Sequence, residues 1–382
     1  MTRPSRVVLA ALLLGCLGPL LFFLRATPDN YTLPSSSYPP GYTVSSPHLP
    51  FPVPAASPPS SSPSPSSPLN DKALNNKQFF WGDDDEEQQS LEELAEEWAN
   101  STWTEGLPFL LFVHVPKTAG SSFKQLLSYL CDESGGIVHH VERFEFLGWS
   151  AEKQNSFCGL YGHFGIGIAE QEEWKVDKPA AYITFLRDPV SRMVSQYNYG
   201  SNRNPKYRNL TLDQFITAKE KEQLFGPWSC INPATGQLAR FWHAEEDELN
   251  EPLPTREDLR RAKARLTASM EEGGIELLGL VERYEDSIRM LEFKLGRRFP
   301  RDLVGMQTNK SQRPTDIHVS DLSDAQLRRI MRMSELDLEL YEFGKKVFEA
   351  RYAAMKRNIL HQDYARQEET ISGEAVQLQV YK

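Results

Sequence analysis

The chain contains 382 residues, 40% of them apolar, and its formal net charge at pH 7 is −10. The length predicts one to three domains, and the apolar fraction is large enough to build a core. Residues 71–105 hold eleven acidic residues against two lysines, which leaves residues 106–382 with a net charge of only −3. The acidity therefore does not exclude a local basic surface for an anionic partner. We expect no nucleic-acid partner, and the cysteine spacing excludes the usual kind of metal site.

The N-terminus has the pattern of a membrane anchor. Residues 1–6 carry two arginines and no acid, and residues 7–24 form an uncharged apolar run of eighteen residues, just long enough to cross a bilayer as a helix. Basic residues before the run favour a cytoplasmic N-terminus and a lumenal remainder. We therefore predict a cytoplasmic tail at 1–6 and a transmembrane signal anchor at 7–24. A cleaved signal peptide is the alternative, because Gly15, Gly18 and Pro19 weaken the helix.

Residues 25–105 are predicted to form a stem. Proline and serine dominate residues 27–70, a composition that cannot bury enough apolar surface to fold, so we expect this part to be disordered. The acidic run at 83–97 could form a short helix with Leu91, Leu94 and Trp98 on one side. A solvated charged face is the favoured interpretation of that run.

The sequence also carries the marks of a secretory route. Four N-x-S/T sequons, the usual acceptors of N-linked glycans, begin at Asn30, Asn100, Asn209 and Asn309. Cys16 lies in the apolar run, so an oxidising lumen allows one disulfide among Cys131, Cys158 and Cys230. The residues leave the pairing open. Our prediction is Cys131 with Cys158, and a buried thiol at the third position.

Residues 106–362 are predicted to form an α/β domain, followed by a C-terminal tail at 363–382. Buried strands are expected at 109–115, 137–141, 157–161, 181–186 and 275–281, and helices at 189–199, 212–218, 255–270, 286–295 and 324–356. This alternation predicts a P-loop-like central parallel sheet flanked by helices on both faces. In such sheets, ligands bind at the carboxyl ends of the strands.

The first candidate site is the turn at residues 116–122, PKTAGSS, between the first strand and an apolar-periodic helix. Such a turn directs backbone N–H groups and a helix N-terminus at one point, which suits a phosphate-like dianion. The usual P-loop places its lysine late and a metal-binding hydroxyl after it. Here Lys117 comes first, which argues against a metal-dependent nucleoside triphosphatase. A plain strand-to-helix turn that binds nothing is the other interpretation.

The second candidate site follows the strand at 181–186. Arg187 lies where this strand ends, Asp188 and Pro189 are suited to begin a helix, and Ser195 lies about two helical turns further on. A guanidinium makes bidentate contacts with a phosphate, and a serine adds a neutral donor. A helix N-cap with a structural arginine is the alternative.

Together these motifs resemble the Golgi carbohydrate sulfotransferases of the heparan sulfate 2-O-sulfotransferase type. The first resembles the family's 5′-phosphosulfate loop, V-P-K-T-A-x-S/T-S/T-F, and the second resembles its 3′-phosphate motif, R-D/N-P-x-x-R-x-x-S. The resemblance implies binding of 3′-phosphoadenosine-5′-phosphosulfate (PAPS) as co-substrate, with no metal. The implied cofactor-binding residues are Lys117, Thr118, Ala119, Gly120, Ser121, Ser122, Arg187, Ser195, and, in a segment that closes over the cofactor, Lys310 and Ser311.

The resemblance also implies the catalytic residues, Lys117 at the leaving phosphate and His163 as the base. Histidine titrates near neutral pH, which suits removal of a proton from a sugar hydroxyl. The family's H-G-H segment reads Tyr161-Gly162-His163 here, so the first histidine is replaced and the hydroxyl position on the acceptor stays open. His139 and His140 are reserve candidates, and His114 is expected to be packed within the first strand. A core or capping role is the alternative for His163.

Two further segments match the family more loosely. Asn232, Gln237 and Arg240 resemble an N-x-Q-x-R element, with a plain polar turn as the alternative. Glu282 belongs to a late strand-and-turn element that we expect to be structural. The basic side chains that could receive an anionic glycan form two groups: Arg203, Lys206 and Arg208, and the predicted helix residues Arg260, Arg261, Lys263 and Arg265. A solvated helix face is the plainer interpretation of the second group.

The sequence thus predicts a single-pass type II Golgi membrane protein whose lumenal domain moves sulfate from PAPS to a hydroxyl of a glycan or glycosaminoglycan. Three alternatives remain: a protein-tyrosine sulfotransferase, a P-loop kinase or NTPase, and a surface scaffold that has lost activity. The acceptor sugar and the oligomeric state are not encoded in any pattern that we recognise.

Overall fold

The computed structural model describes residues 84–132, 136–138, 143–204, 207–226, 229–241, 251–305 and 316–380. The predicted tail, anchor and Pro/Ser-rich stem lie outside these residues, as do His139, His140, Lys206, Lys310 and Ser311. Among the helices of the described part, none is long and apolar enough to span a bilayer.

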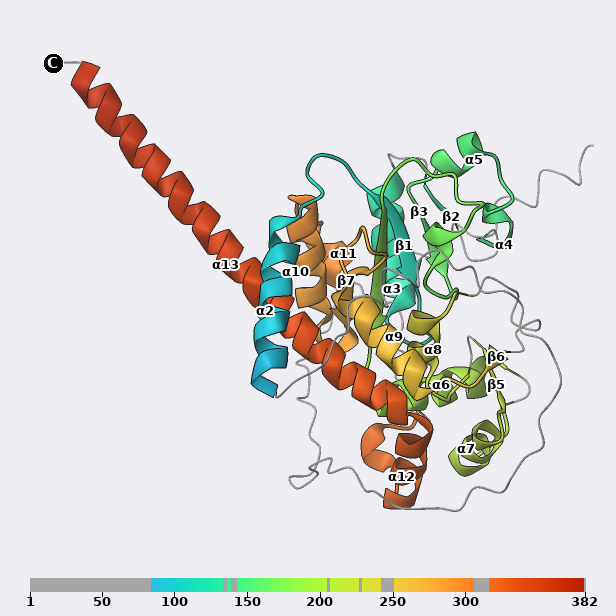
Figure 1. The fold of residues 1–382 in the computed structure, drawn as a ribbon. Helices are drawn as coiled ribbons and strands as arrows, with labels where there is room; N and C mark the ends of the chain where they lie inside the picture. The colour runs from blue at the N-terminus through green and yellow to red at the C-terminus, as the bar shows by residue number, and fades with distance from the viewer. Residues whose placement is uncertain are drawn as a thin grey trace, which may run out of the picture. The chain divides into compact units, whose positions relative to one another are not determined.

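A five-stranded parallel sheet lies at the centre of the fold (Figure 1). Its strands, in spatial order, are β2 (Ile137–Val138), β3 (Gly159–Gly162), β1 (Phe109–Val113), β4 (Ala180–Leu186) and β7 (Ile275–Leu280). Every residue of β1, β3 and β7 is buried, as expected for a parallel sheet covered on both faces. The predicted parallel α/β sheet is therefore confirmed. A separate antiparallel pair joins β5 (Leu224–Phe225) to β6 (Glu251–Pro252).

Helices connect and cover these strands. They are α2 (Asp84–Asn100), α3 (Gly120–Cys131), α4 (Arg143–Phe146), α5 (Ala151–Asn155), α6 (Pro189–Arg203), α7 (Leu212–Glu220), α8 (Pro233–Ala239), α9 (Arg256–Thr267), α10 (Tyr284–Leu295), α11 (Arg301–Gly305), α12 (Asp324–Met333) and α13 (Glu335–Val380), with 3₁₀ turns at Ile168–Glu170, Val281–Arg283 and Val319–Asp321. Helix α13 contacts α2, α9, α8, α10 and β7. It also continues through residues that we expected to form a tail.

The acidic run is not the solvated face that we expected. Leu91, Ala95 and Trp98 of α2 are buried, and the helix lies alongside α13 (Figure 1). The indole Nε1 of Trp98 donates to the carbonyl oxygen of Glu276 in β7 at 2.7 Å, and the ammonium of Lys294 in α10 donates to the carbonyl oxygen of Trp98 at 2.9 Å. Helix α2 is therefore packed into the sheet domain.

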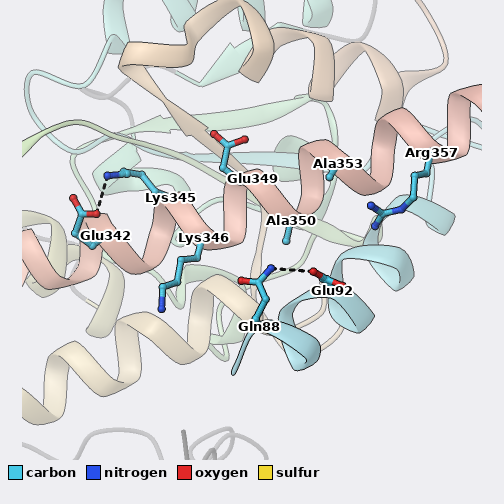
Figure 2. A pocket seen from close by; sticks show the side chains of 9 residues that line it. All are labelled: Gln88, Glu92, Glu342, Lys345, Lys346, Glu349, Ala350, Ala353 and Arg357. Carbon is cyan, nitrogen blue, oxygen red and sulfur yellow. Dashed lines mark hydrogen bonds and ion pairs between the residues drawn. The ribbon is translucent and has the colours of Figure 1, made fainter. Parts of the chain in front are cut away.

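A shallow groove of about 400 Å³ runs between α2 and α13 (Figure 2). Its lining carries both signs of charge. Arg357 pairs with Glu96 across the two helices, and Lys345 pairs with Glu342 along α13. None of the residues that line the groove is one of the predicted site residues.

The single helix predicted at 324–356 is two helices. Ser334 separates α12 from α13, with φ −111° and ψ 19°. The side-chain oxygen of Asn232 accepts from the backbone N–H groups of Leu336 and Asp337, at 2.9 and 3.1 Å. An asparagine from a distant segment therefore satisfies the first turn of α13, a break that helical periodicity alone does not reveal.

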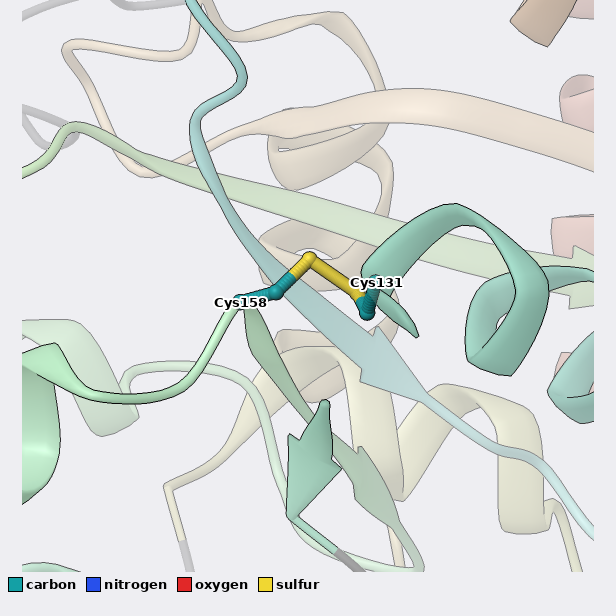
Figure 3. Close-up of a disulfide and its surroundings, with 2 residues drawn as sticks. All are labelled: Cys131 and Cys158. Carbon is teal, nitrogen blue, oxygen red and sulfur yellow. A yellow bond between two sulfur atoms is a disulfide. The ribbon is translucent and has the colours of Figure 1, made fainter. Parts of the chain in front are cut away.

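The predicted disulfide between Cys131 and Cys158 is confirmed (Figure 3). It joins the end of α3 to the residue before β3, with 5.5 Å between the two Cα atoms. Cys230 is a buried free thiol, as expected, and burial raises its pKa to about 11. A thiol with this pKa is protonated and unreactive at neutral pH.

Candidate active site at the carboxyl ends of the strands

The loop after β1 has a strained backbone. Lys117 and Ala119 both have positive φ angles, 70° and 61°, which are uncommon for non-glycine residues. The buried hydroxyl of Thr118 donates to the carbonyl oxygen of Val115 at 2.7 Å and so closes the loop on itself. Ala119 is the N-cap of α3 and provides no side-chain cap. The loop therefore directs the N-terminus of α3 toward the edge of the sheet where an anion can bind.

Arg187 lies beside this loop. It directly follows β4, the neighbour of β1 in the sheet, and its Nη1 donates to the carbonyl oxygen of Lys117 at 3.2 Å. Burial lowers the pKa of Arg187, and the nearby carboxylates of Glu282 and Asp188 oppose that shift. A guanidinium titrates so far above neutral pH that it stays charged. The two predicted anion motifs are therefore adjacent at one edge of the sheet.

The start of α6 is built as its sequence predicts. The carboxylate of Asp188 accepts from the N–H of Ser191 at 2.7 Å, and Pro189 occupies the first helical position. Ser195 lies two turns into this helix and is partly exposed. One turn further on, the ring of Tyr199 faces Lys117, whose Nζ lies 3.9 Å from the ring centroid. Helix α6 therefore contributes to both anion motifs.

His163 follows β3, the other neighbour of β1. Its Nδ1 lies 2.7 Å from the carbonyl oxygen of His114, an atom that only accepts hydrogen bonds. In the neutral imidazole, Nδ1 therefore carries the proton and Nε2 is the basic nitrogen. His163 as a whole residue is 9% exposed, so little of it is open to bulk water.

His114 has a larger role than packing in a strand. It lies just past the end of β1, is partly exposed, and its ring stacks on that of His163 with 4.5 Å between centroids. Its other side abuts α3, where a Cβ on Gly120 would lie only 2.0 Å from His114 Nε2. Sequence patterns do not reveal this contact, because it depends on β3 lying next to β1.

Gln237 of the N-x-Q-x-R element connects the segments that carry His114 and His163. Gln237 Nε2 donates to the carbonyl oxygens of His114 and Phe164, at 2.9 and 3.1 Å, and so ties the ends of β1 and β3 to α8. Its side-chain oxygen has no partner among the described residues. This element, which the sequence left as either a family match or a polar turn, is a structural clamp.

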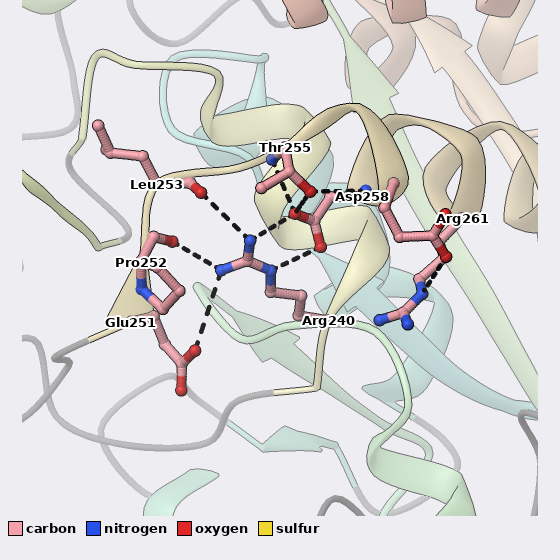
Figure 4. A network of polar contacts seen from close by, with 8 residues as sticks. Arg240, Glu251, Pro252, Leu253, Thr255, Asp258 and Arg261 are labelled. Carbon is pink, nitrogen blue, oxygen red and sulfur yellow. Dashed lines mark hydrogen bonds and ion pairs between the residues drawn. The ribbon is translucent and has the colours of Figure 1, made fainter. Parts of the chain in front are cut away.

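Arg240 fixes the other end of α8 (Figure 4). Its Nε donates to Asp258 at 2.7 Å, and its Nη1 donates to the carbonyl oxygen of Pro252 at 2.6 Å. Burial of Asp258 raises the pKa of its carboxyl group. Hydrogen bonds from Arg240 and Thr255 outweigh burial and lower that pKa to about 2.

Glu282 has the structural role that we expected. One of its carboxylate oxygens accepts from the N–H of Asp188 at 3.0 Å, and the other accepts from the hydroxyl of Tyr341 at 3.1 Å. It therefore connects the turn that carries Arg187 to α13.

The basic side chains of α9 are not a free anion-binding surface. Arg260 and Arg261 both contact Glu257 of their own helix, Lys263 pairs with Glu339 at 2.8 Å, and Arg265 pairs with Glu170 at 3.0 Å. Each cation in this group already has a carboxylate partner. Arg260 and Arg261 are exposed, as a solvated helix face predicts, whereas Lys263 and Arg265 are partly buried in ion pairs with other elements. Within the described ranges, no three His, Cys, Asp or Glu side chains gather as a metal site would require.

Fold and site together define an α/β protein with two candidate anion sites at the carboxyl edge of its sheet. The two sites are the loop after β1 and the turn after β4, and a histidine after β3 lies on the opposite side of that loop.

Comparison with known proteins identifies the family. A family model described as the sulfotransferase family matches residues 100–344. Heparan sulfate 2-O-sulfotransferase 1 of Gallus gallus is 24% identical over 270 residues, which cover 63% of this chain and 70% of that protein. The Homo sapiens protein of the same name is 24% identical over 275 residues, with the same coverage. The chain belongs to the sulfotransferase family, as its motifs indicated, and is an enzyme of that kind.

Proposed function

We propose that this enzyme transfers a sulfuryl group from PAPS to a hydroxyl of a glycan, and that this glycan is a glycosaminoglycan. The observation that carries the proposal is the hydrogen bond between Arg187 and the carbonyl oxygen of Lys117, because it brings both anion motifs to one edge of the sheet. The family supports PAPS as donor, and the names of the relatives support heparan sulfate as the first acceptor to test.

The donor would bind through groups on adjacent elements. Lys117 and the loop from Thr118 to Ser122 would hold the 5′-phosphosulfate, and Arg187 with Ser195 would hold the 3′-phosphate. Backbone N–H groups and a guanidinium are the usual ligands of such dianions. Lys310 and Ser311 stay predicted contributors, since they lie outside the described residues. Independence from metals also stays a prediction.

The chemistry would be an in-line transfer. The acceptor oxygen would form a bond to sulfur while the bond from sulfur to the bridging phosphate oxygen breaks, and the electron pair would leave with that phosphate. Lys117 would stabilise the charge that develops there. His163 Nε2 would take the proton of the acceptor hydroxyl, because Nδ1 is committed to the carbonyl oxygen of His114.

The cellular setting follows from the N-terminal pattern. We propose a single-pass type II protein of the Golgi membrane, anchored by residues 7–24, with the sulfotransferase domain in the lumen. Tyr161 in place of a histidine leaves the acceptor hydroxyl unassigned.

The direct test is incubation of the full chain with sulfate-labelled PAPS and a panel of heparan, chondroitin and neutral glycans. We expect label on a glycosaminoglycan, no magnesium requirement and no consumption of ATP. Transfer to a tyrosine peptide instead would identify a protein-tyrosine sulfotransferase, and ATP turnover would identify a kinase or NTPase.

Two substitutions test the assigned roles. Lys117→Ala and His163→Ala should each lower kcat by about 10²-fold or more, the usual range for loss of an electrostatic stabiliser or a general base. Lys178→Ala and His361→Ala remove exposed residues of the same types and should leave kcat unchanged. If His163→Ala retains kcat with its fold intact, another group is the base.

A further inference from the structure

One segment of the chain contacts both the backbone carbonyl and the side-chain ammonium of Lys117. Its carbonyl oxygen accepts from Arg187 Nη1 at 3.2 Å, and its ammonium lies over the ring of Tyr199, 3.9 Å from the centroid. Arg187 immediately precedes the α6 cap, and Tyr199 lies in the third turn of α6. Ser195 and Tyr199 are four residues apart, so they lie on the same face of the helix.

A lysine that stabilises a leaving group needs its ammonium held in one position. Its side chain is a flexible stem that carries a point charge, and holding it in one rotamer costs conformational entropy. The stabilising charge must nevertheless stay where the leaving oxygen becomes negative. The strained φ of 70° fixes the backbone of Lys117, but it does not fix the ammonium.

An aromatic ring is better suited than a carboxylate to hold the Lys117 ammonium in position. The face of a tyrosine ring attracts an ammonium without neutralising its charge. An acidic partner would compete with the anionic donor for the same cation. The ring can therefore restrain the ammonium without itself neutralising the charge.

We propose that Tyr199 is a positioning residue, whose ring holds the Lys117 ammonium at the 5′ end of the donor. The inference rests on the proposed function for the identity of that donor. The segment that begins at Arg187 and continues through α6 then carries groups for both ends of one nucleotide, Arg187 and Ser195 for the 3′-phosphate and Tyr199, through Lys117, for the 5′ end. The helix thereby sets the spacing between the two anion sites.

The test compares two substitutions in the full chain. Tyr199→Phe keeps the ring face and removes only the hydroxyl, whereas Tyr199→Leu removes the ring. The probes are 3′-phosphoadenosine 5′-phosphate, which engages both anion sites, and adenosine 3′-monophosphate, which lacks the 5′ group. Tyr129→Leu, at an exposed tyrosine of α3, is the control.

We expect Tyr199→Leu to lower kcat/KM for PAPS about tenfold and to weaken binding of the bisphosphate by a similar factor. Binding of adenosine 3′-monophosphate should not change, because Lys117 does not serve the 3′ end. Tyr199→Phe should restore both quantities to within about threefold of the wild type, since a phenyl ring also attracts cations.

Three outcomes would overturn the inference. The first is that Tyr199→Leu matches the wild type in kcat/KM and bisphosphate affinity. The second is that Tyr199→Leu weakens both probes equally, which would indicate damage to α6. The third is that Tyr199→Phe loses as much as Tyr199→Leu, which would assign the effect to the hydroxyl. If the wild type transfers no sulfate from PAPS, the proposed function fails, and the two binding measurements still decide whether the ring supports the 5′ site.

Discussion

Among single residues, Gly120 shows how closely the site is packed, because His114 lies where its side chain would be. A Cβ at this position would meet His114 Nε2 at 2.0 Å. We predict that Gly120→Ala lowers the free energy of unfolding by about 1 to 3 kcal/mol, the usual cost of overpacking. It should also lower sulfate transfer, because displacing His114 disturbs the ring stacked on His163.

The control for this prediction is Gly106→Ala, where a Cβ meets nothing within 4 Å. That substitution should change stability by no more than about 0.5 kcal/mol. Urea unfolding and turnover of both variants provide the comparison. Equal stability and equal turnover of the two variants would show that His114 moves aside at no cost.

The same residues show what sequence could predict about the site. Lys117 and Arg187 were expected at the carboxyl ends of strands, and the parallel sheet brings those ends to one edge, together with the end of β3 that His163 follows. The contacts of His114 with His163 and Gln237 span 49 and 123 residues. They depend on the strand order, in which β1 lies between β3 and β4, and hydrophobic periodicity does not specify that order.

Among secondary-structure elements, the junction of α8 with α9 depends on one carboxylate. Asp258 is 4% exposed and accepts from Arg240 and Thr255 (Figure 4). We predict that Asp258→Asn lowers the free energy of unfolding by about 2 to 3 kcal/mol, as for the loss of charged hydrogen bonds. Thermal unfolding would measure the change.

Glu257, the preceding residue, is the matched control. It is exposed and pairs only with arginines of its own helix among the contacts described. Surface ion pairs contribute about 0 to 1 kcal/mol, so Glu257→Gln should have little effect. A loss as large as that of Asp258→Asn would mean that the helix, and not the α8 junction, is the sensitive element.

The pH dependence of stability tests the same carboxylate independently. Its pKa is about 2 in the folded protein against an ordinary value of 3.8. The folded state therefore favours the ionised form, and this stabilisation is fully present above about pH 4 and is lost as the pH falls toward 2. The stability difference between wild type and Asp258→Asn, measured by urea unfolding, should shrink across that window. A constant difference would contradict the assignment.

Elements with strong periodic patterns were predicted well, and elements defined by remote contacts were not. The buried strands and α6, with its Asp188 cap, follow from local sequence. The break at Ser334 does not, because Asn232 satisfies the first turn of α13 from about a hundred residues away. The pairing of the α9 cations with Glu170 and Glu339 likewise depends on tertiary packing.

For the molecule as a whole, the folded domain includes a helix that composition assigned to the stem. Charge density predicted a solvated segment, yet an amphipathic helix needs only one buried stripe. The stripe of α2 ends at Trp98, beside the fully buried Lys294, which pairs with Glu276. Burial lowers the pKa of Lys294, and Glu276 opposes that shift. The carbonyl oxygen of Trp98 in α2 accepts one of the hydrogen bonds that this buried ammonium donates.

This packing predicts that a protein beginning at residue 106 is much less stable than one beginning at residue 84. Removing α2 exposes the surface under Leu91 and Trp98 and deprives Lys294 of its bonds to the carbonyl oxygen of Trp98 and the hydroxyl of Ser101. Loss of a buried Trp alone typically costs about 3 to 5 kcal/mol. Melting temperatures of the two proteins would decide the matter, with Trp98→Ala in the longer one expected to fall between them. Equal melting temperatures would mean that α2 rests on the domain without stabilising it.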